Sequence, residues 1–408
     1  MIIPEKVNYI LDKINENKFE SFIVGGCVRD SLLGYTPNDY DITTSAKPND
    51  LINIFKEHKL ILSGIKHGTV SVLVDEEIFE ITTYRIENEY IDNRRPKDVI
   101  FSDDIYEDLK RRDFTINSMA YNKSRGIIDL FGGGDDLNKK IIKTVGDPNE
   151  RFNEDALRMI RCIRFSAKLG FKIEEKTLSS IYENSHLIKN ISIERITDEF
   201  DKILKSDNVD RLKILFDTNI LKNIELNFSD FNFDELLKLN RVKNLDDRII
   251  LFGYLTKDIN VLEKLKYSKK TMDNIQKSIH IKEKLKENIN KYEIKFILKD
   301  FGYERVYNTL NIFKDYYKFD LSKCEQYTYL LSILEDIKES DECYNLDKLQ
   351  IKGTELIKLG YNGKDVGNKL RYLLHIVIKN NELNKKEILI NLLENSSKSS
   401  DDKDYQHR

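Results

Sequence analysis

The chain has 408 residues, of which 40% are hydrophobic and 34% charged, and its formal net charge is −3. This length exceeds one ordinary core and predicts two to four domains. Near-neutrality argues against nucleic-acid binding over the whole surface but allows a local basic face. The four cysteines lack the paired spacing of a zinc site or a disulfide framework, and no apolar run is long enough to span a membrane. We therefore expect a reduced, cytoplasmic setting.

Helical and strand-like periods alternate in the first 130 residues. Residues 1–18 place apolar side chains on one side of a helix, and strands are predicted at 21–24, 40–44, 69–74 and 78–84. The acidic residues 75–77 predict a hairpin turn between the last two strands. From about residue 150 the spacing is helical almost throughout. The sequence therefore predicts an α/β head that ends near residues 140–150 and an all-helical remainder.

A glycine pair and two carboxylates near the N-terminus indicate nucleotidyl chemistry. An apolar run leads into Gly25 and Gly26, where backbone amides can approach a phosphate closely. Arg29 follows in a helix-like segment, and its guanidinium group can neutralise the charge of the phosphate. Asp39 and Asp41 are one residue apart, so in an extended strand their side chains point the same way. Two such oxygen ligands suit Mg²⁺. Alone, the pair would more often be a loop or capping feature, but the upstream glycines favour a catalytic site.

A third carboxylate often completes such a metal site from a neighbouring strand. Glu80 lies in the strand predicted at 78–84 and is the candidate. An ordinary solvated strand residue is an equally good interpretation of Glu80.

Lys110, Arg111 and Arg112 are three consecutive cations, which would repel one another unless an anion lay nearby. This favours contacts with triphosphate oxygens. Asp113 and Asn117 are four residues apart, on one predicted helical face, and would meet sugar hydroxyls. The alternative interpretation is a solvated, capped helix start.

Ordered motifs across about residues 20–205 resemble those of one family. They are GGCVRDSLLG, DYDITTSA, ITTYRIE, RRDFTINSMAYN, DLFGGGDDL and EDALRMIRCIRFSAKLGF. They look like the motifs of class II tRNA nucleotidyltransferases, the CCA-adding enzymes, which bacterial poly(A) polymerases share. The resemblance implies an α+β architecture in which a polymerase-β-like nucleotidyltransferase head precedes all-helical neck, body and tail domains. It also implies that Asp39 and Asp41 bind the catalytic metal and that the segment 111–117 contacts ribose.

The segment around Asp155 and Arg158 bears on base selection. The two residues are three apart, which would place them on one helical face. Arginine only donates hydrogen bonds and ionised aspartate only accepts them, so the pair can match cytosine and adenine and mismatch uracil and guanine. An ordinary surface ion pair is the alternative, but the resembled family uses this motif as a protein template for CTP and ATP. Arg161 and Arg164 continue the basic row toward the triphosphate or the RNA.

Two other segments matter through the resemblance. Full CCA-adding enzymes need a loop for the terminal A between the Glu80 strand and Arg111, where this chain has Asp92, Arg94 and Arg95. A solvated surface loop is the alternative. The tail of bacterial CCA-adding enzymes, which contacts tRNA, has glycine spacing similar to that of Gly360, Gly363 and Gly367. A tight turn between helices explains these glycines equally well.

These patterns predict five parts. They are a catalytic head at residues 1–145, a base-selecting neck at 146–206, a helical body at 207–300, a tRNA-binding tail at 301–395 and a disordered C-terminal segment at 396–408. The predicted reaction is the template-independent addition of CCA to the 3′ end of tRNA from CTP and ATP, with Mg²⁺ as cofactor and pyrophosphate as product. The alternatives are a poly(A) polymerase, an A-only or CC-only tRNA nucleotidyltransferase, and a catalytically silent RNA-binding scaffold. Intact Asp39 and Asp41 argue against the scaffold.

Overall fold

The computed structural model describes residues 1–87, 90–91, 95–96, 99–228, 231–286 and 289–396. The chain divides into two compact units, the first formed by Met1–Asn240 with Asn260–Lys266 and the second by Arg241–Ile259 with Tyr267–Arg408. The catalytic motifs of the sequence all fall in the first unit. The predicted domain boundaries at residues 145, 206 and 300 stay predictions.

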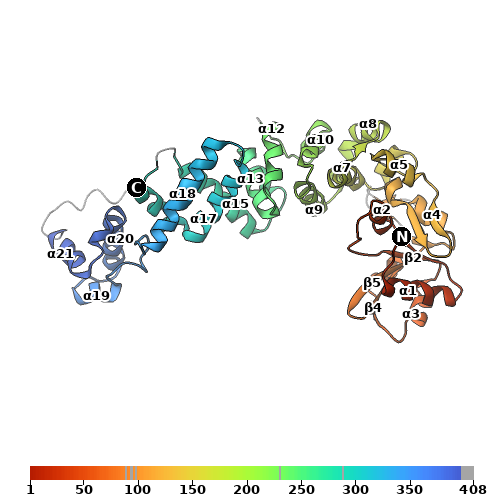
Figure 1. Cartoon of the computed structure of the whole chain (residues 1–408), viewed down its shortest axis with the longest axis horizontal. Coiled ribbons are helices and arrows are strands. Elements are labelled where there is room, and N and C mark those ends of the chain that lie inside the picture. The colour runs from red at the N-terminus through yellow and green to blue at the C-terminus, as the bar shows by residue number, and fades with distance from the viewer. Residues whose placement is uncertain (88–89, 92–94, 97–98, 229–230, 287–288, 397–408) are drawn as a thin grey trace. The chain divides into compact units, whose positions relative to one another are not determined.

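A seven-stranded sheet forms the N-terminal part of the first unit (Figure 1). Its strand order is β11-β10-β1-β2-β5-β4-β3, with only β2 and β5 parallel, and the bounds in chain order are β1 Ser21–Val24, β2 Ile42–Thr44, β3 Lys59–Ile61, β4 Thr69–Val74, β5 Glu77–Thr83, β10 Met119–Asn122 and β11 Gly126–Asp129. All four side chains of β1 are buried, as expected for an apolar strand at the centre of a sheet.

The strand predictions are confirmed to within two residues. β1 and β4 begin and end where predicted, whereas β2 begins at Ile42 rather than at residue 40 and β5 is shifted by one residue toward the N-terminus. The hairpin between β4 and β5 turns at Asp75 and Glu76, which both have positive φ. Two positive φ values match the right-handed twist of the flanking strands, so this turn fixes their register.

Three pairs of short strands complete the β structure of the described residues. They are β6 Arg85–Glu87 with β9 Val99–Phe101, β7 Tyr90–Ile91 with β8 Arg95–Pro96, and β12 Ile141–Ile142 with β13 Lys172–Ile173. Because β13 lies beyond residue 150, the helical part of the first unit includes one two-residue strand.

The helices of the first unit cover the sheet and then continue the chain without it. α1 packs against β1 through its buried side chains Val7, Ile10, Leu11 and Ile14, which are those of the predicted amphipathic face. The bounds are α1 Glu5–Glu16, α2 Gly26–Leu32, α3 Pro48–Ile54, α4 Ile105–Lys110, α5 Gly133–Lys139, α6 Pro148–Glu154, α7 Leu157–Leu169, α8 Glu175–Asn184, α9 Ile193–Leu204, α10 Leu212–Asp217, α11 Ile220–Asn223, α12 Phe233–Leu236 and α14 Asn260–Glu263.

The second unit is helical throughout its described residues. Its helices are α13 Leu245–Thr256, α15 Lys269–Lys284, α16 Lys291–Phe301, α17 Tyr303–Tyr316, α18 Leu321–Glu339, α19 Gly353–Lys358, α20 Lys364–Lys379 and α21 Lys386–Ser396. α19, α20 and α21 enclose an apolar cluster that includes Leu356, Leu373 and Leu389. The predicted fold class, an α+β head followed by helices, is confirmed.

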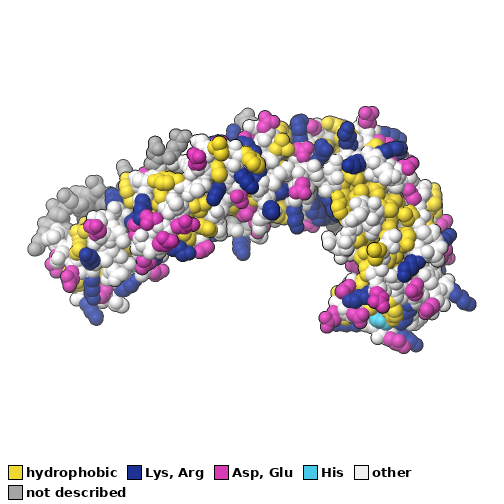
Figure 2. Space-filling view, viewed as in Figure 1, with side chains coloured by type: hydrophobic (Ala, Val, Ile, Leu, Met, Phe, Trp, Pro, Cys, Tyr) yellow, Lys and Arg dark blue, Asp and Glu magenta, His cyan; other side chains and the backbone are white. Residues whose placement is uncertain are grey.

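Acidic and basic side chains are interspersed on the visible face of each unit (Figure 2). This distribution agrees with the small net charge of −3. Over the described part of the chain, no helix is both long and apolar enough to cross a membrane.

Gly133 offers a test of the packing beneath the site. A Cβ at this residue would lie 2.2 Å from the backbone oxygen of Thr115, whereas a Cβ at Gly134 would meet only a side-chain oxygen at 3.3 Å. We expect Gly133→Ala to destabilise the protein by about 1–3 kcal/mol, because backbone cannot move aside as a side chain can. Thermal unfolding measures the loss, with Gly134→Ala as the matched control. Equal midpoints for the two variants would contradict this packing.

Candidate active site

Three carboxylates lie at the start of β2 and on the neighbouring strand. The backbone N–H of Val24 donates to the carbonyl of Asp41 at 3.0 Å, which fixes Asp41 beside the end of β1. The parallel register pairs Ile42 with Ile81, so Glu80 occupies the strand position next to Asp41. Asp39 precedes Asp41 by two residues. The strands therefore bring together the three carboxylates that the sequence singles out.

The electrostatics of Asp41 reflect this crowding. Protein atoms around its carboxyl group displace water and raise its pKa, although the residue as a whole stays exposed. The negative charges of Asp39 and Glu80 raise the pKa further, and the Arg112 guanidinium opposes them. Like charges held this close favour a bound cation, since it relieves their repulsion.

These residues fit a divalent cation that is shared with a substrate. Hard oxygen donors are the ligands that Mg²⁺ prefers, and it commonly takes one or two carboxylates with waters and substrate phosphates. Within the described ranges, no three His, Cys, Asp or Glu side chains converge closely enough to hold a metal by themselves. The arrangement is thus an open, incomplete donor set rather than a closed structural site.

The glycine turn makes room for an arginine. Gly25 has φ +80°, and a Cβ there would lie 3.0 Å from Nη1 of Arg112. Gly26 begins α2, and a Cβ there would make ordinary contact with Arg29. Arg112 therefore lies over the turn and close to Asp41, and its buried Nε has no hydrogen-bond partner among the described residues. A cation with spare donors at this turn suits an incoming anion.

A buried aspartate that we did not single out from the sequence holds both arginines. Asp108 is fully buried and pairs with Arg111 at 2.7 Å and with Arg112 at 3.1 Å. Burial would raise the pKa of Asp108, but the two guanidinium groups outweigh it and lower the pKa. The signal in the sequence is the spacing, since Asp108 precedes the arginines by three and four residues on α4. Asp108 therefore fixes the positions of both guanidinium groups.

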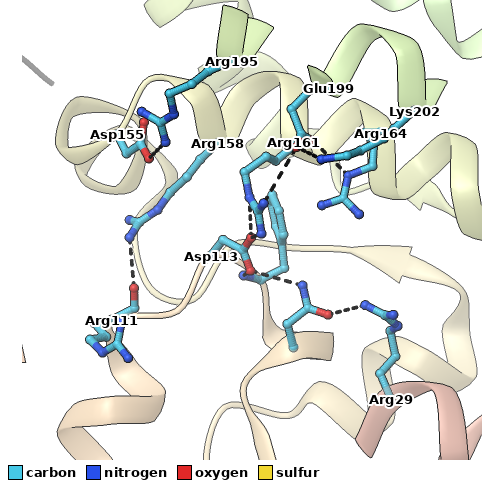
Figure 3. Close-up of polar contacts among 12 residues, drawn as sticks. Arg29, Arg111, Asp113, Asp155, Arg158, Arg161, Arg164, Arg195, Glu199 and Lys202 are labelled. Carbon is cyan, nitrogen blue, oxygen red and sulfur yellow. Dashed lines mark hydrogen bonds and ion pairs between the residues drawn. The ribbon is translucent and has the colours of Figure 1, made fainter. Parts of the chain in front are cut away.

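Asp113 and Asn117 are neighbours, although they do not share a helical face. α4 ends at Lys110, and only Thr115–Asn117 forms a further 3-10 turn, so the predicted continuous helix is wrong. Asn117 nevertheless donates from Nδ2 to Asp113 at 3.1 Å and accepts from Arg29 at 2.6 Å (Figure 3). Because Arg29 is only 2% exposed and also pairs with Asp30, it orients Asn117 from within the protein.

Asp155 and Arg158 also depart from the predicted helical face. α6 ends at Glu154 and α7 begins at Leu157, so Asp155 lies in the break between the two helices with extended backbone. Its carboxylate accepts from the backbone N–H of Leu157 and from Arg195 at 3.2 Å.

Arg158 is nearly buried and holds two elements together. It is 8% exposed, pairs with Glu154 at 2.5 Å and donates to the carbonyl of Arg111 at 3.0 Å. Figure 3 shows Asp155 bonded to Arg195, whereas Arg158 extends toward the carbonyl of Arg111. The sequence reasoning missed Arg195 and Glu154 as partners of this pair.

Arg161 and Arg164, the predicted basic row, each bind a carboxylate of the protein. Arg161 donates two hydrogen bonds to Asp113, at 2.9 and 2.6 Å, and Arg164 donates to Glu199 at 2.8 Å. Glu199 belongs to α9. Both arginines therefore position other residues of the site.

The remaining predicted residues lie elsewhere. Asp92 and Arg94 are outside the described residues, and the backbone of Arg95 pairs with Ile91 between β8 and β7. In the second unit, Gly360 and Gly363 have positive φ, Gly363 precedes α20, and Gly367 lies within it. Their tRNA-binding role stays a prediction.

Comparison with known proteins defines the class. Residues 21–143 match the poly A polymerase head domain, and residues 170–228 match a domain described as the probable RNA and SrmB-binding site of polymerase A. The first match spans the sheet, the glycine turn and the carboxylates, so this part is a nucleotidyltransferase head.

Relatives narrow the class to one family. Over 312 residues the chain is 38% identical to the CCA-adding enzyme of Staphylococcus aureus (strain MRSA252). The aligned segment covers 75% of this chain and 76% of that enzyme. The chain is 50% identical to the Pediococcus pentosaceus CCA-adding enzyme over 207 residues, or 51% of this chain and 52% of that relative. The chain belongs to the CCA-adding enzyme family, as its motifs predict.

Solved structures agree over nearly the whole length. The crystal structure of the Bacillus stearothermophilus CCA-adding enzyme in complex with CTP matches with a TM-score of 0.81 at 27% identity, covering 97% of this chain and 99% of that one. The Thermotoga maritima CCA-adding enzyme complexed with tRNA has the same fold, with a TM-score of 0.66 at 22% identity and coverage of 97% and 96%.

Asp113 predicts how acid affects stability. Although burial opposes it, Arg161 lowers the pKa of Asp113 to about 2 from its usual 3.8. A lowered pKa stabilises the folded state above about pH 4, and this contribution, about 2 kcal/mol, is lost as the pH falls toward 2. We expect Asp113→Asn to show a shallower fall in unfolding midpoint between pH 5 and 3 than the unchanged protein. Asp12→Asn, at an exposed position, serves as control. If Asp113→Asn does not change the slope of unfolding midpoint against pH, the pairing of Asp113 with Arg161 is contradicted.

Proposed function

We propose that this chain adds CCA to the 3′ end of tRNA, using CTP and ATP and releasing pyrophosphate. The observation that carries the proposal is that the charges of Asp39 and Glu80 act on Asp41, close to Arg112 at the Gly25 turn, in a chain of the CCA-adding enzyme family. Relatives of the same fold were solved with CTP, ATP and tRNA. We also propose a cytoplasmic location, because tRNA, CTP and ATP are present there.

We propose Mg²⁺ as the cofactor, held by Asp39 and Asp41 with Glu80 beside them. When bound, it assists deprotonation of the tRNA 3′-hydroxyl and neutralises charge on the phosphates. The guanidinium Nη1 of Arg112 lies over the glycine turn, so Arg112 is the group that meets the triphosphate in this proposal. Arg111 shares Asp108 with Arg112 and adds to the positive charge.

Sugar and base are read by separate groups in this proposal. Asp113 and Asn117 present a carboxylate and an amide, which together accept from and donate to ribose hydroxyls. Asp155 and Arg158 supply an acceptor and a donor to the edge of the base, which matches cytosine and adenine. Arg195 and Glu154 hold these two side chains in place.

Poly(A) polymerases are the nearest alternative, since they share the head domain. A tRNA that ends at the discriminator base, incubated with one labelled nucleotide at a time, separates the possibilities. A three-nucleotide product that requires both CTP and ATP supports CCA addition. A ladder of A supports a poly(A) polymerase, and products limited to C,C or to A support the partial enzymes.

Substitution of Asp41 tests the metal assignment. We expect Asp41→Ala to lower incorporation at least about 100-fold while the protein stays folded, because the cation would lose a ligand that also orients the reacting groups. Incorporation of labelled CTP and thermal unfolding are measured in parallel. Asp12→Ala, an exposed aspartate of α1, is the matched control. Turnover at the unchanged rate would refute the assignment.

Substitution of Asp155 tests base selection. We expect Asp155→Ala to reduce the preference for CTP over UTP about 10-fold or more, because the acceptor for the exocyclic amine is lost. Values of kcat/KM are compared for the four nucleotides, with Asp135→Ala in α5 as control. If CTP and ATP stay preferred to the same extent, Asp155 does not read the base.

A further inference from the structure

Three guanidinium groups surround one buried aromatic ring in the first unit. The ring of Phe165, on α7, lies 5.3 Å from Arg29, 5.6 Å from Arg161 and 3.5 Å from Arg164, measured from ring centroid to guanidinium carbon. Three like charges at one ring repel one another unless carboxylates compensate them. Each arginine has such a partner, and the pairs are Arg29 with Asp30, Arg161 with Asp113 and Arg164 with Glu199.

Glu199 is the compensating carboxylate that comes from outside the motifs assigned to nucleotide binding. It lies on α9 and its side chain is 3% exposed. It accepts from Arg164 at 2.8 Å and from Lys202 at 2.9 Å, and Arg161 lies 4.0 Å away. Burial would raise the pKa of Glu199, but Arg164, Lys202 and Arg161 together outweigh it and lower the pKa, so the carboxylate is charged.

A continuous series of contacts leads from Glu199 to the sugar-binding pair. Arg161 lies between Glu199 and Asp113, and it donates two hydrogen bonds to Oδ2 of Asp113. The other oxygen, Oδ1, accepts from Asn117, whose own oxygen accepts from Arg29 (Figure 3). Asn117 is 6% exposed and is therefore held on both sides.

Removal of the charge at Glu199 would change this balance. Arg164 and Lys202 would lose their carboxylate, and the three arginines would compete for the two carboxylates that are left, Asp30 and Asp113. Asp113 is the nearer one to Arg161 and Arg164, so its hydrogen bond to Asn117 would be the one disturbed. The base-reading residue Asp155 is hydrogen-bonded by Arg195 instead, one turn earlier on α9, and it acts on Arg161 only through its charge.

We propose that Glu199 is a positioning residue for Asp113 and Asn117 and thereby sets the preference for ribose over deoxyribose in the incoming nucleotide. This proposal rests on the proposed function, since it assumes that Asp113 and Asn117 meet the sugar. It separates two kinds of specificity that originate on one helix: Glu199 acts on the sugar, and Arg195 acts on the base.

The test compares CTP, dCTP and UTP with Glu199→Gln, which keeps the size of the side chain and removes its charge. We expect the ratio of kcat/KM for CTP to that for dCTP to fall about 5- to 10-fold, the effect of weakening one hydrogen bond. The ratio for CTP to UTP is expected to change less than about twofold, because Asp155 keeps its partner. Glu194→Gln, on the same helix but with a 62% exposed side chain, is the matched control.

Two further measurements keep the outcome decisive. Glu199→Asp retains the charge, so it is expected to fold and to lower the CTP to dCTP ratio less than Glu199→Gln does. If the protein adds no nucleotide to tRNA, the proposed function is refuted but the role of Glu199 is not. In that case calorimetry of CTP and dCTP binding to the protein without tRNA gives the same comparison of sugar preference. The proposal is overturned if the sugar preference matches that of Glu194→Gln, or if sugar and base preference fall together.

Discussion

The ion pair between Asp113 and Arg161 joins the sheet-bearing part of the first unit to α7, and much of the site depends on it. Asp113 follows the helix that carries Asp108, whereas Arg161 comes from the helix that follows Asp155. Breaking this partly buried pair would leave a charge without its partner. The pair is therefore less a source of net stability than a constraint on geometry. Any movement of α7 relative to the sheet would separate Arg161 from Asp113 unless the segment that carries Asp113 moved with it.

This constraint explains how so many arginines coexist in one site. Arg29, Arg161 and Arg164 each have a carboxylate, so that part is nearly neutral and its side chains cannot turn toward a ligand without leaving a buried partner. Arg111 and Arg112 instead both pair with Asp108, next to the glycine turn and the carboxylates. Arginines paired one to one with carboxylates thus shape the site, and Arg112, over the glycine turn, suits the triphosphate.

Sequence patterns predicted the elements well and the side-chain partners poorly. Strand bounds followed from alternation of apolar residues, and the turn at Asp75 and Glu76 followed from its composition, because both depend on neighbours in sequence. The helical faces assigned to Asp113 and Asp155 failed, since each lies where a helix is interrupted and tertiary contacts decide the backbone. Glu199 and Arg195 could not be found from spacing, because their partners lie 35 and 40 residues away.

The interruption at Asp155 has a chemical consequence that a continuous helix would not allow. One carboxylate oxygen of Asp155 accepts from the N–H of Leu157 at the start of α7, where helix N–H groups lack partners within the helix. The second oxygen accepts from Arg195. A carboxylate fixed at two points has one orientation, whereas a side chain on a solvated helical face would rotate freely. Orientation of the acceptor is what distinguishes an exocyclic amine from a carbonyl at the same place, so the helix break makes Asp155 better suited to read a base than the predicted helical face would.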